Sequence, residues 1–475
     1  MKSTPILLIV LATVVVFASI AFVGGSPKRQ VAPIVATALT MPSTSSELSR
    51  TVHLIDMLPP GFVTDGSVDY SNEVRTAFQA AAGGRLVLPN FPVRVSRAAG
   101  QNWCVRVEAP TLVEGSPSAA LVEAQGGVQL LRVQNVEGFT IRDVTLRGRA
   151  SQGQGLGHGL LQVFGGKDVL IERVRIDGCD ADGIAVANTE GVTVRGCTVV
   201  HASKTALYVN GSSRVRVTGN EAVAFGGHRT PQGAVVGTGI QLSSNRDVVC
   251  SQNVLQGGTG VGILVNSLDG GAAPLGTIVS ENRVTGVTNP TNNNVSCGIR
   301  LTNGSGDGKT QTLVTGNSLR GCGAHGIYLE NHHGALVTNN TVAESERSGI
   351  LVSTVQDAIV SGNIVLNSGT SGLTNNYQIH LINQATGVIV RGNELRDLAA
   401  FEPGAAVDAI GDESRGTPNV VEPAFVVAEA PRFKGPSQAG EVVLDRSPTA
   451  GSYIGWVCVQ SGDPGVWRTF GRIEY

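Results

Sequence analysis

A repeat of 23 residues, marked by asparagine, is the feature of this sequence that most restricts its fold. Asn317, Asn340 and Asn363 each end a short stretch of alternating apolar residues, and Ile327 and Ile350 open the next stretch ten residues after an asparagine. Strands this short cannot bury an apolar face alone, but they can when equal coils stack and pair. The repeat therefore predicts an all-β, right-handed parallel β-helix with three short strands and three turns per coil.

The repeat can be followed in both directions as two series of positions. We expect the first series to form a ladder, because asparagine tolerates left-handed backbone angles and its amide can bond the next coil. The predicted ladder positions are Asp143, Arg173, Cys197, Asn220, Asn253, Asn282, Asn317, Asn340, Asn363 and Asn393. The predicted openers of the following strand are Leu160 or Leu161, Ile184, Leu207, Ile240, Ile263, Ile299, Ile327, Ile350 and Ile379. These series predict about ten coils.

The rest of the chain divides around these coils. Lys2 and the apolar run over residues 5–23 are typical of a secretory signal, although the run is long enough for an uncleaved membrane anchor. Either interpretation places the protein outside the cytoplasm, secreted or anchored at the cell surface. The expected segments are 1–25 (signal or anchor), 26–50 (linker), 51–108 (N-terminal cap), 109–404 (β-helix) and 405–475 (C-terminal β module).

The predicted N-terminal cap carries a family resemblance. Ser71–Ala82 predicts a short amphipathic helix capped by Ser71, and Arg85–Val95 predicts a pair of strands. Ala77, Gln79, Ala80, Val87, Leu88 and Pro89 resemble the A-x-Q-A helix and V-x-L-P strand that begin pectate-lyase-like β-helices. The resemblance departs at residues 90–92, where the family usually has Pro-Gly-x-Tyr. It implies a site outside the coil, on one sheet and its flanking loops.

The C-terminal residues carry a second resemblance. The last 25 residues read as two strands around a Ser-Gly-Asp-Pro-Gly turn. The pattern Gly455–Val459, Gly462, Pro464, Gly465, Trp467, Phe470 and Gly471 resembles a module that follows β-helices in some bacterial and phage-associated proteins. This resemblance implies a cap or an assembly module, and it leaves a homotrimer open.

Composition excludes several classes of partner. The formal charge is −2, and no basic cluster with aromatic residues is present, so nucleic acid is not an expected partner. Seven scattered cysteines without a CxxC pair predict buried thiols rather than zinc ligands. We expect no cofactor and no metal. A divalent cation such as Ca²⁺ would be compatible with the expected chemistry, but no motif supports one.

Four insertions lengthen the same predicted corner of the coils. They are Arg147–Gly157, Phe225–Gly237, Val287–Ser296 and Ser368–Asn376, on the first, fourth, sixth and ninth coils. Insertions in solenoids collect on one face, which is often the binding face. We therefore predict two grooves between these walls, the first over coils 2–3 and the second over coils 7–8. The first would be ~14 Å wide from the strand spacing, enough for one extended sugar chain.

The first groove gathers residues suited to acidic polysaccharide chemistry. β-Elimination and C5 epimerisation both begin by removing the proton α to a uronate carboxylate, which requires a cation, a base and an acid. Lys204 or Arg229 could neutralise the carboxylate, His201 could be the base and Tyr208 the acid. Asp180 and Asp182 could instead form the carboxylate pair of a glycoside hydrolase. His158 and His228 are expected to contact substrate from the walls.

Plainer interpretations stay open for each residue. The two aspartates can cap turn amides, His201 and Lys204 can be solvated, and an outward tyrosine can serve cross-strand packing. The second groove offers Arg300 and Tyr328, predicted vertical neighbours that bind substrate, with His325, Glu330, His332 and His333. The last two are expected to be a solvated turn rather than a metal site. The functional prediction is an exported lyase, epimerase or hydrolase of acidic polysaccharide. The alternative is a non-catalytic carbohydrate-binding or structural rod.

Overall fold

The computed structural model describes most of the chain from residue 50 onward. The described residues are 50–149, 159–229, 235–268, 273–289, 296–302, 311–369, 377–396, 408–414, 419–421, 425–428, 439–440, 442–445, 448–462 and 465–474. By internal contacts the chain divides into Met1–Ser45 and Ser46–Tyr475, and every described residue lies in the second unit.

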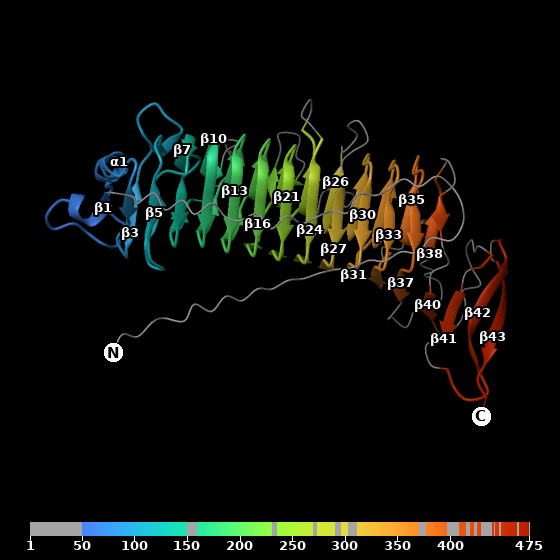
Figure 1. The fold of residues 1–475 in the computed structure, drawn as a ribbon. Coiled ribbons are helices and arrows are strands. Elements are labelled where there is room, and N and C mark those ends of the chain that lie inside the picture. Colours follow the sequence, from blue (N-terminus) through green and yellow to red (C-terminus); the bar gives the residue numbers. More distant parts are fainter. Residues whose placement is uncertain are drawn as a thin grey trace, which may run out of the picture. The chain divides into compact units, whose positions relative to one another are not determined.

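Three parallel strands per coil make up this unit, and each pairs with the equivalent strand of the next coil (Figure 1). The first strands are β4 Trp103–Val107, β7 Gln129–Glu137, β10 Gly159–Glu172, β12 Asp182–Ala187, β15 Thr205–Asn210, β20 Thr238–Ser243, β23 Val261–Asn266, β26 Ile299–Thr302, β29 Ile327–Glu330, β32 Ile350–Ser353, β35 Tyr377–Ile382 and β38 Asp408–Asp412. The second strands are β1 Thr51–His53, β2 Arg85–Val87, β5 Leu112–Glu114, β8 Thr140–Arg142, the second half of β10, β13 Glu190–Arg195, β16 Ser213–Thr218, β21 Arg246–Ser251, β24 Leu275–Ser280, β27 Thr312–Thr315, β30 Ala335–Thr338, β33 Ile359–Ser361, β36 Ile389–Arg391 and β39 Val420–Val421. The third strands are β3 Pro92–Val95, β6 Ala120–Glu123, β9 Thr145–Arg147, β11 Arg175–Cys179, β14 Thr198–Ala202, β17 Glu221–Val223, β22 Val254–Gln256, β25 Arg283–Thr285, β28 Ser318–Arg320, β31 Thr341–Ala343, β34 Ile364–Leu366, β37 Glu394–Arg396, β40 Phe425–Ala428 and β41 Val442–Asp445. These pairings extend past both expected limits of the coils, residues 109 and 404.

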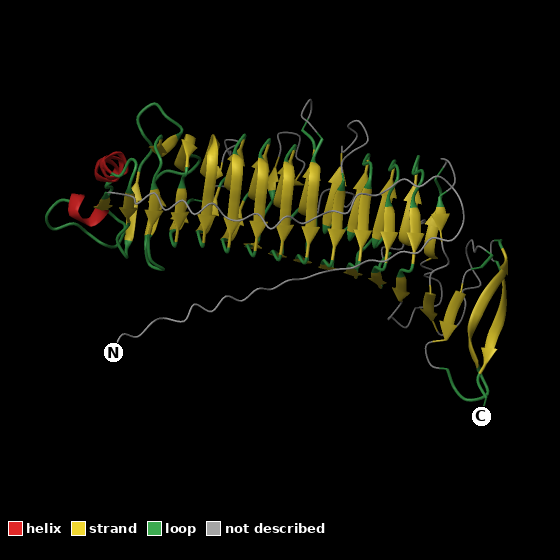
Figure 2. Cartoon of the chain, viewed as in Figure 1, coloured by secondary structure: helices red, strands yellow, loops and turns green. Residues whose placement is uncertain are grey.

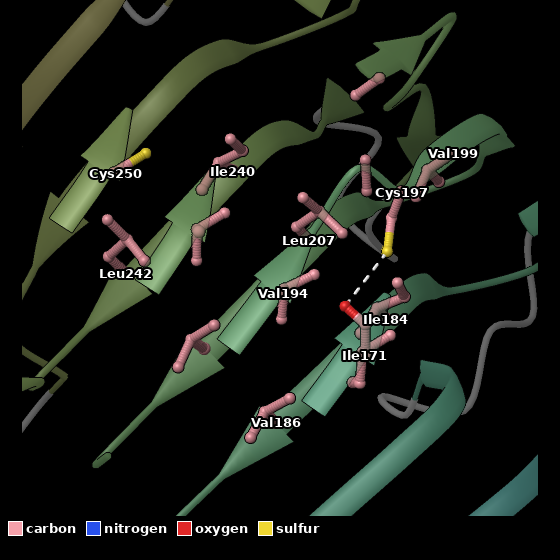
Figure 3. Close-up of a cluster of buried hydrophobic side chains, with 14 of the residues drawn as sticks. Ile171, Ile184, Val186, Val194, Cys197, Val199, Leu207, Ile240, Leu242 and Cys250 are labelled. Atoms are coloured by element: carbon pink, nitrogen blue, oxygen red, sulfur yellow. Dashed lines mark hydrogen bonds between the residues drawn. The ribbon is translucent and has the colours of Figure 1, made fainter. Parts of the chain in front are cut away.

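The predicted openers form one internal column. Leu161, not Leu160, pairs with Ile184, and the register continues through Leu207, Ile240, Ile263, Ile299, Ile327, Ile350 and Ile379. Each of these side chains is at most 1% exposed, so the column is the spine of the core. Figure 3 shows part of this core, where Ile184, Leu207 and Ile240 pack with Val194 and Val199.

The predicted asparagine ladder is confirmed from Asn220 to Asn393. Each side-chain Nδ2 donates to the Oδ1 of the asparagine one coil further on, over 2.8–3.0 Å. The same Oδ1 accepts a backbone N–H, and each Nδ2 also donates to a main-chain carbonyl. Buried backbone groups at this turn are thus satisfied by side chains, as burial requires. Cys197 begins the ladder, and its thiol donates to the Ile171 carbonyl (Figure 3).

The ladder prediction needs two corrections. The predicted ladder positions Asp143 and Arg173 are wrong by one residue, because the residues that align with Cys197 are Val144 and Val174. The two charged residues instead pair with each other beside the ladder, with 2.7 Å between Arg173 Nε and Asp143 Oδ1. Left-handed backbone angles belong to this preceding position, with φ near +60° in Asp143, Gly219 and Gln252, rather than to the asparagines.

A cap precedes the first complete coil (Figure 2). It contains the short helix η1 Leu54–Met57 and the predicted helix α1 Ser71–Ala80, whose Val74, Ala77 and Phe78 are buried. The predicted Ser71 cap is wrong. Tyr70 is the N-cap residue, and Asp69 Oδ1 accepts the Ser71 backbone N–H at 2.9 Å. Asp69 does this because it precedes the first turn, where its carboxylate reaches the exposed amides.

The other end changes strand direction. β42 Tyr453–Gln460 pairs antiparallel with β41, and β43 Val466–Arg472 pairs antiparallel with β42. The two predicted C-terminal strands are therefore present, and they form a hairpin on the last parallel strand.

All four predicted insertions connect a third strand to the next first strand. The described part of the second insertion is a small hairpin of β18 His228–Arg229 and β19 Val235–Val236. Residues 150–158, 290–295 and 370–376 lie outside the described residues, so most of the predicted walls do as well. Among the described residues, no helix has the length and apolarity needed to cross a bilayer. The predicted signal or anchor over residues 5–23 lies outside them.

Candidate functional site

The outward face of the first strands carries the candidate site. Each residue after an opener points away from the core, as expected from the alternation along a strand. In register order these residues are Gln162, Ala185, Tyr208, Gln241, Leu264, Arg300, Tyr328, Leu351 and His380. Polar side chains therefore gather at two places along this face, around Tyr208 and around Arg300 to His380.

The two aspartates of the first predicted groove are buried rather than presented to solvent. Asp182 is 2% exposed, and its Oδ1 accepts the Thr205 backbone N–H at 3.1 Å. Asp180 is 6% exposed and lines a small pocket with Glu123. The turn-capping interpretation therefore describes Asp182, and Asp180 belongs to an interior cluster.

Tyr208 is the best placed of the first-groove residues. It is half-buried, and burial raises the pKa of its phenol although a hydrogen bond with Ser243 opposes this shift. Ser243 Oγ in turn donates to Asn266 Oδ1 at 2.7 Å, so a polar row crosses three coils. Within the described residues, no side-chain contact joins His201 or Lys204 to Tyr208. His201 is exposed at the end of β14, on the other sheet.

The wall residues of the first groove are only partly described. His158 lies outside the described residues, and of Arg229 only the backbone is described, in β18. His228 is partly exposed, and its backbone N–H donates to the Ser203 carbonyl at 2.8 Å. This bond places the start of the hairpin beside the turn that carries Lys204.

The second group is a connected charge cluster. Arg300 and Tyr328 are vertical neighbours as predicted, and the Arg300 guanidinium lies 5.2 Å from the centre of the Tyr328 ring. Arg300 Nη2 lies 2.5 Å from Glu330 Oε2, and Thr302 Oγ1 donates to the same oxygen at 3.2 Å. Burial would raise the pKa of Glu330, but hydrogen bonds from Arg300, Tyr328 and Thr302 hold it below its usual value. Burial and the negative charge of Glu330 raise the pKa of Tyr328.

A neutral histidine stands beside this cluster. His325 is 6% exposed, and its ring centre lies 5.4 Å from that of Tyr328. Burial, together with the positive charge of Arg347, lowers the pKa of His325 to about 3. Its ring bonds the backbone of Ser348, and Nδ1 has no partner among the described residues. The imidazole is thus an uncharged base at neutral pH.

A second histidine–tyrosine pair lies two coils away, about 10 Å along the face. The ring centres of Tyr377 and His380 are 4.5 Å apart. The Tyr377 hydroxyl donates to Glu413 Oε1 at 3.0 Å, and His380 Nε2 lies 3.5 Å from Glu413 Oε2. Burial lowers the pKa of His380 even with this carboxylate nearby. Leu351 and Ser348 separate the two pairs.

Sequence reasoning missed Arg347 and Glu413. Arg347 has no carboxylate partner in the described part of the chain, unlike Arg300, and its backbone N–H donates to the Ala324 carbonyl. Its position one residue before the turn column of His325 and Ser348 is a signal that could have found it. Glu413 lies after the last predicted opener, so the coil pattern did not reach it.

The predicted solvated turn at His332 and His333 is half wrong. His332 is 2% exposed, and its Nε2 lies 3.2 Å from Thr312 Oγ1. His333 Nε2 lies 2.9 Å from Asp357 Oδ2. The two rings thus turn to different partners, because one faces the core and the other the surface.

We expect His325 to make stability depend on pH. The pKa of His325 is about 3 in the folded protein, below its value in the unfolded chain. At a pH between these two values, the unfolded chain therefore binds a proton that the folded chain does not. The contribution of neutral His325 to the free energy of unfolding is complete above pH 6.5. It decreases as the pH falls, and the loss is roughly 2–3 kcal/mol at pH 4.5. Unfolding in urea at pH 7 and 4.5 should show a smaller loss for His325→Gln than for the wild type. Equal losses in both proteins would contradict this assignment.

The comparisons with known proteins agree with the coiled fold. Residues 126–312 match the sequence profile of the family described as the right handed beta helix region. The chain therefore has the fold of a right-handed parallel β-helix, and its central part matches the profile of this family. Residues 273–399 of this β-helix protein also match the profile of the periplasmic copper-binding protein NosD.

Solved structures with similar coils include enzymes and phage proteins. The A-module of mannuronan C-5 epimerase AlgE6 from Azotobacter vinelandii is 17% identical with a TM-score of 0.47, covering 80% of this chain and 100% of that one. The tailspike protein of E. coli bacteriophage HK620 is 13% identical with a TM-score of 0.48, covering 85% and 68%. The exopolygalacturonase of Thermotoga maritima is 12% identical with a TM-score of 0.36, covering 73% and 90%. No curated protein matches the chain.

The described donor set does not fit a copper centre. Among described residues, no group of three or more histidine, cysteine or acidic side chains converges. All seven cysteines are unpaired and buried, and burial raises the pKa of Cys297 and Cys322, the two thiols within the NosD match, to about 12. Copper prefers thiolate, thioether and imidazole ligands held together, and these residues supply no such set.

Proposed function

We propose that this β-helix protein acts on an acidic polysaccharide, which it binds across the outward face of β26, β29, β32 and β35. The proposed chemistry removes the proton α to a uronate carboxylate and leads to epimerisation or β-elimination. One observation carries the proposal: the neutral imidazole of His325 lies against the ring of Tyr328, whose phenol is protonated. The positive charge of Arg347, which has no carboxylate partner among the described residues, acts on the same imidazole.

These three groups supply the three functions that the reaction needs. Arg347 pairs with the uronate carboxylate, which lowers the cost of forming negative charge at the α-carbon. His325 is the proposed base. Its imidazole is uncharged at neutral pH, and the negative charge of a bound uronate would raise its pKa from about 3 towards the range in which a base works best. Tyr328 donates a proton, either to the leaving glycosidic oxygen in elimination or to the opposite sugar face in epimerisation. The Arg300–Glu330 pair holds the phenol in place.

The same cluster is poorly suited to hydrolysis. Glycoside hydrolysis uses two carboxyl groups, one of them protonated to serve the leaving group. Glu330 is held in its anionic form by Arg300. Burial raises the pKa of Glu123 to about 7, but this side chain is 3% exposed and cannot reach a sugar on the face. Proton abstraction is therefore the favoured reaction class.

The first groove stays as the second candidate position for this chemistry. There Tyr208 would be the acid, His201 the base and Lys204 or Arg229 the cation, with His158 and His228 contacting substrate. The polar row from Tyr208 through Ser243 to Asn266 supports substrate binding at this place.

Deuterium exchange separates the reaction classes. The protein is incubated with polymannuronate, polyguluronate or polygalacturonate in D₂O, and C5 deuteration is followed by NMR with ultraviolet absorbance of unsaturated ends. Epimerisation gives C5 deuterium with an unchanged chain, and elimination gives unsaturated ends. New reducing ends alone would indicate hydrolysis. Binding without any of these products would favour the non-catalytic rod.

Three further sequence predictions accompany this function. The apolar run over residues 5–23 supports export, as a cleaved signal or as a membrane tether. The C-terminal module with its hairpin of β42 and β43 is proposed as a cap or assembly element, which keeps the homotrimer as a prediction.

A further inference from the structure

The outward column that carries Arg300 and Tyr328 begins, near the N-terminal cap, with two arginines. Arg106 of β4 pairs in register with Arg132 of β7, and Arg132 pairs with Gln162 of β10. From Arg132 the register pairs lead to Arg300 in six steps, which correspond to ~29 Å along the coils. The arginines are thus far from the proposed reacting group but on the same face.

The guanidinium of Arg132 has no counter-charge in the described part of the chain. No ion pair or hydrogen bond joins it to another described residue, and its Nε is buried without a partner. The nearest carboxylate belongs to the more exposed neighbour, since Arg106 Nη2 lies 2.5 Å from Glu108 Oε1. Like charges on adjacent strands repel, and a buried donor without an acceptor is costly. The pair therefore favours an anionic group that comes from outside the chain.

The face between these arginines and Arg300 is polar but uncharged. The first outward column over this distance consists of Gln162, Ala185, Tyr208, Gln241 and Leu264. The second column, two residues further along each strand, consists of Phe164, Ala187, Asn210, Ser243 and Asn266. Amide and hydroxyl groups can bond sugar hydroxyls, and no carboxylate in these columns repels a polyanion.

An exposed aromatic ring lies at the start of the second column. Phe164 is 43% exposed, and its register neighbours are Gln134 on one side and Ala187 on the other. No described side chain of these neighbours is apolar and large enough to cover the ring. Ligand sites combine aromatic surface with a few polar groups, so the ring can pack against the apolar face of a sugar whose hydroxyls bond nearby amides.

We propose that the two columns from Arg132 to Arg300 form a binding track for the acidic polysaccharide, in which Arg132 and Arg106 hold a uronate carboxylate far from the reacting sugar. The inference rests on the proposed function, because it takes the same polymer as its ligand. The chain lies along the coils, and Phe164 packs against one of its rings near the arginines. These contacts contribute affinity and no chemistry, so the track makes the protein selective for long acidic chains.

The dependence of affinity on chain length tests the binding track. Trisaccharides and decasaccharides of mannuronate, guluronate and galacturonate are titrated calorimetrically into the full chain carrying Tyr328→Phe, which prevents turnover. A trisaccharide is too short to reach from Arg300 to Arg132, whereas a decasaccharide is long enough. We expect one of the decasaccharides to bind at least about tenfold more tightly than its trisaccharide, and Arg132→Gln to weaken that decasaccharide about tenfold. Arg132→Lys should restore part of the loss, and added salt should reduce it.

Arg216→Gln is the matched control for the loss of charge. Arg216 is half-buried in β16, points outward from the sheet of second strands, and has no ion pair with a described residue. Its replacement removes the same charge from a different face and should leave decasaccharide affinity unchanged. Phe164→Ala alters an exposed position, so it should fold normally and weaken the decasaccharide several-fold. If Arg132→Gln lowers the Tm, Phe164→Ala decides the comparison.

The outcomes separate the binding track from the proposed reaction. Equal affinities for the two chain lengths, or equal effects of Arg132→Gln and Arg216→Gln, would overturn the track even if the protein epimerises or cleaves a polyuronate. A decasaccharide that binds through Arg132 but yields no product with the wild type would support the track and reject the proposed chemistry.

Discussion

Replacing Tyr328 by phenylalanine should lower kcat on the active polyuronate by ~10²–10⁴-fold, the usual contribution of a general acid. The loss should appear in kcat more than in KM, because the phenol serves the transition state rather than substrate binding. The ring contacts with His325 and Arg300 persist in the variant, so its melting temperature should stay near that of the wild type. Steady-state rates and thermal melts check both expectations.

Tyr208→Phe is the matched control for this variant. Both tyrosines are half-buried on the same outward column, and burial raises the pKa of each phenol. The control should keep most of the activity if the reaction takes place at the second group. The reverse result, an inactive Tyr208→Phe with an active Tyr328→Phe, would move the site to the first groove.

Asn317→Ala should cost roughly 3–5 kcal/mol of stability, because it orphans several buried groups at once. The side-chain amide and the backbone N–H of Asn282 both lose their acceptor, and the Val279 carbonyl loses its donor. Asn317 is 1% exposed, so water cannot replace these partners without opening the turn. Urea unfolding measures the total, and hydrogen exchange at the Asn282 amide measures the local effect.

The neighbouring residue provides the control for the ladder. Ser318 has an exposed side chain in β28, and Ser318→Ala should change stability by less than about 0.5 kcal/mol. If Asn317→Ala lowers the free energy of unfolding no more than Ser318→Ala does, the ladder fixes the register between coils but does not stabilise the protein. Solenoids unfold in part, so the exchange rates decide where the loss falls.

The coils were predictable because their spacing is a direct physical constraint. The opener column from Ile184 to Ile379 followed from apolar alternation at equal intervals, and the asparagine ladder from the same count. The ladder positions of the first two coils were wrong by one residue, since valine replaces asparagine there and the charged neighbours Asp143 and Arg173 resemble turn residues. Spacing alone does not distinguish a left-handed turn residue from the ladder residue that follows it.

The candidate site was less predictable for a different reason. Sequence reasoning placed Asp180 and Asp182 on the groove floor, because an Asp-x-Asp-Gly turn does not reveal which way its carboxylates point. Asp180 shares a small pocket with Glu123, which lies on the third strand of an earlier coil. Sequence reasoning compared only residues at the same turn, so it did not bring these two residues together. Arg300 and Tyr328 were placed correctly because they share the opener register, which fixes both their height and their face.

The change of strand direction at β41 and β42 also bears on self-association. A stack of parallel coils offers its last coil as a template on which another chain could continue the same hydrogen bonding. Here the sheet of third strands ends in a hairpin instead. Its first strand, β42, runs antiparallel to β41, and the register of the hairpin shifts between Cys458 and Gln460. A strand of an incoming copy therefore cannot pair in parallel with β41, because that edge is already taken by β42. The hairpin in this way blocks end-to-end continuation of the sheet of third strands.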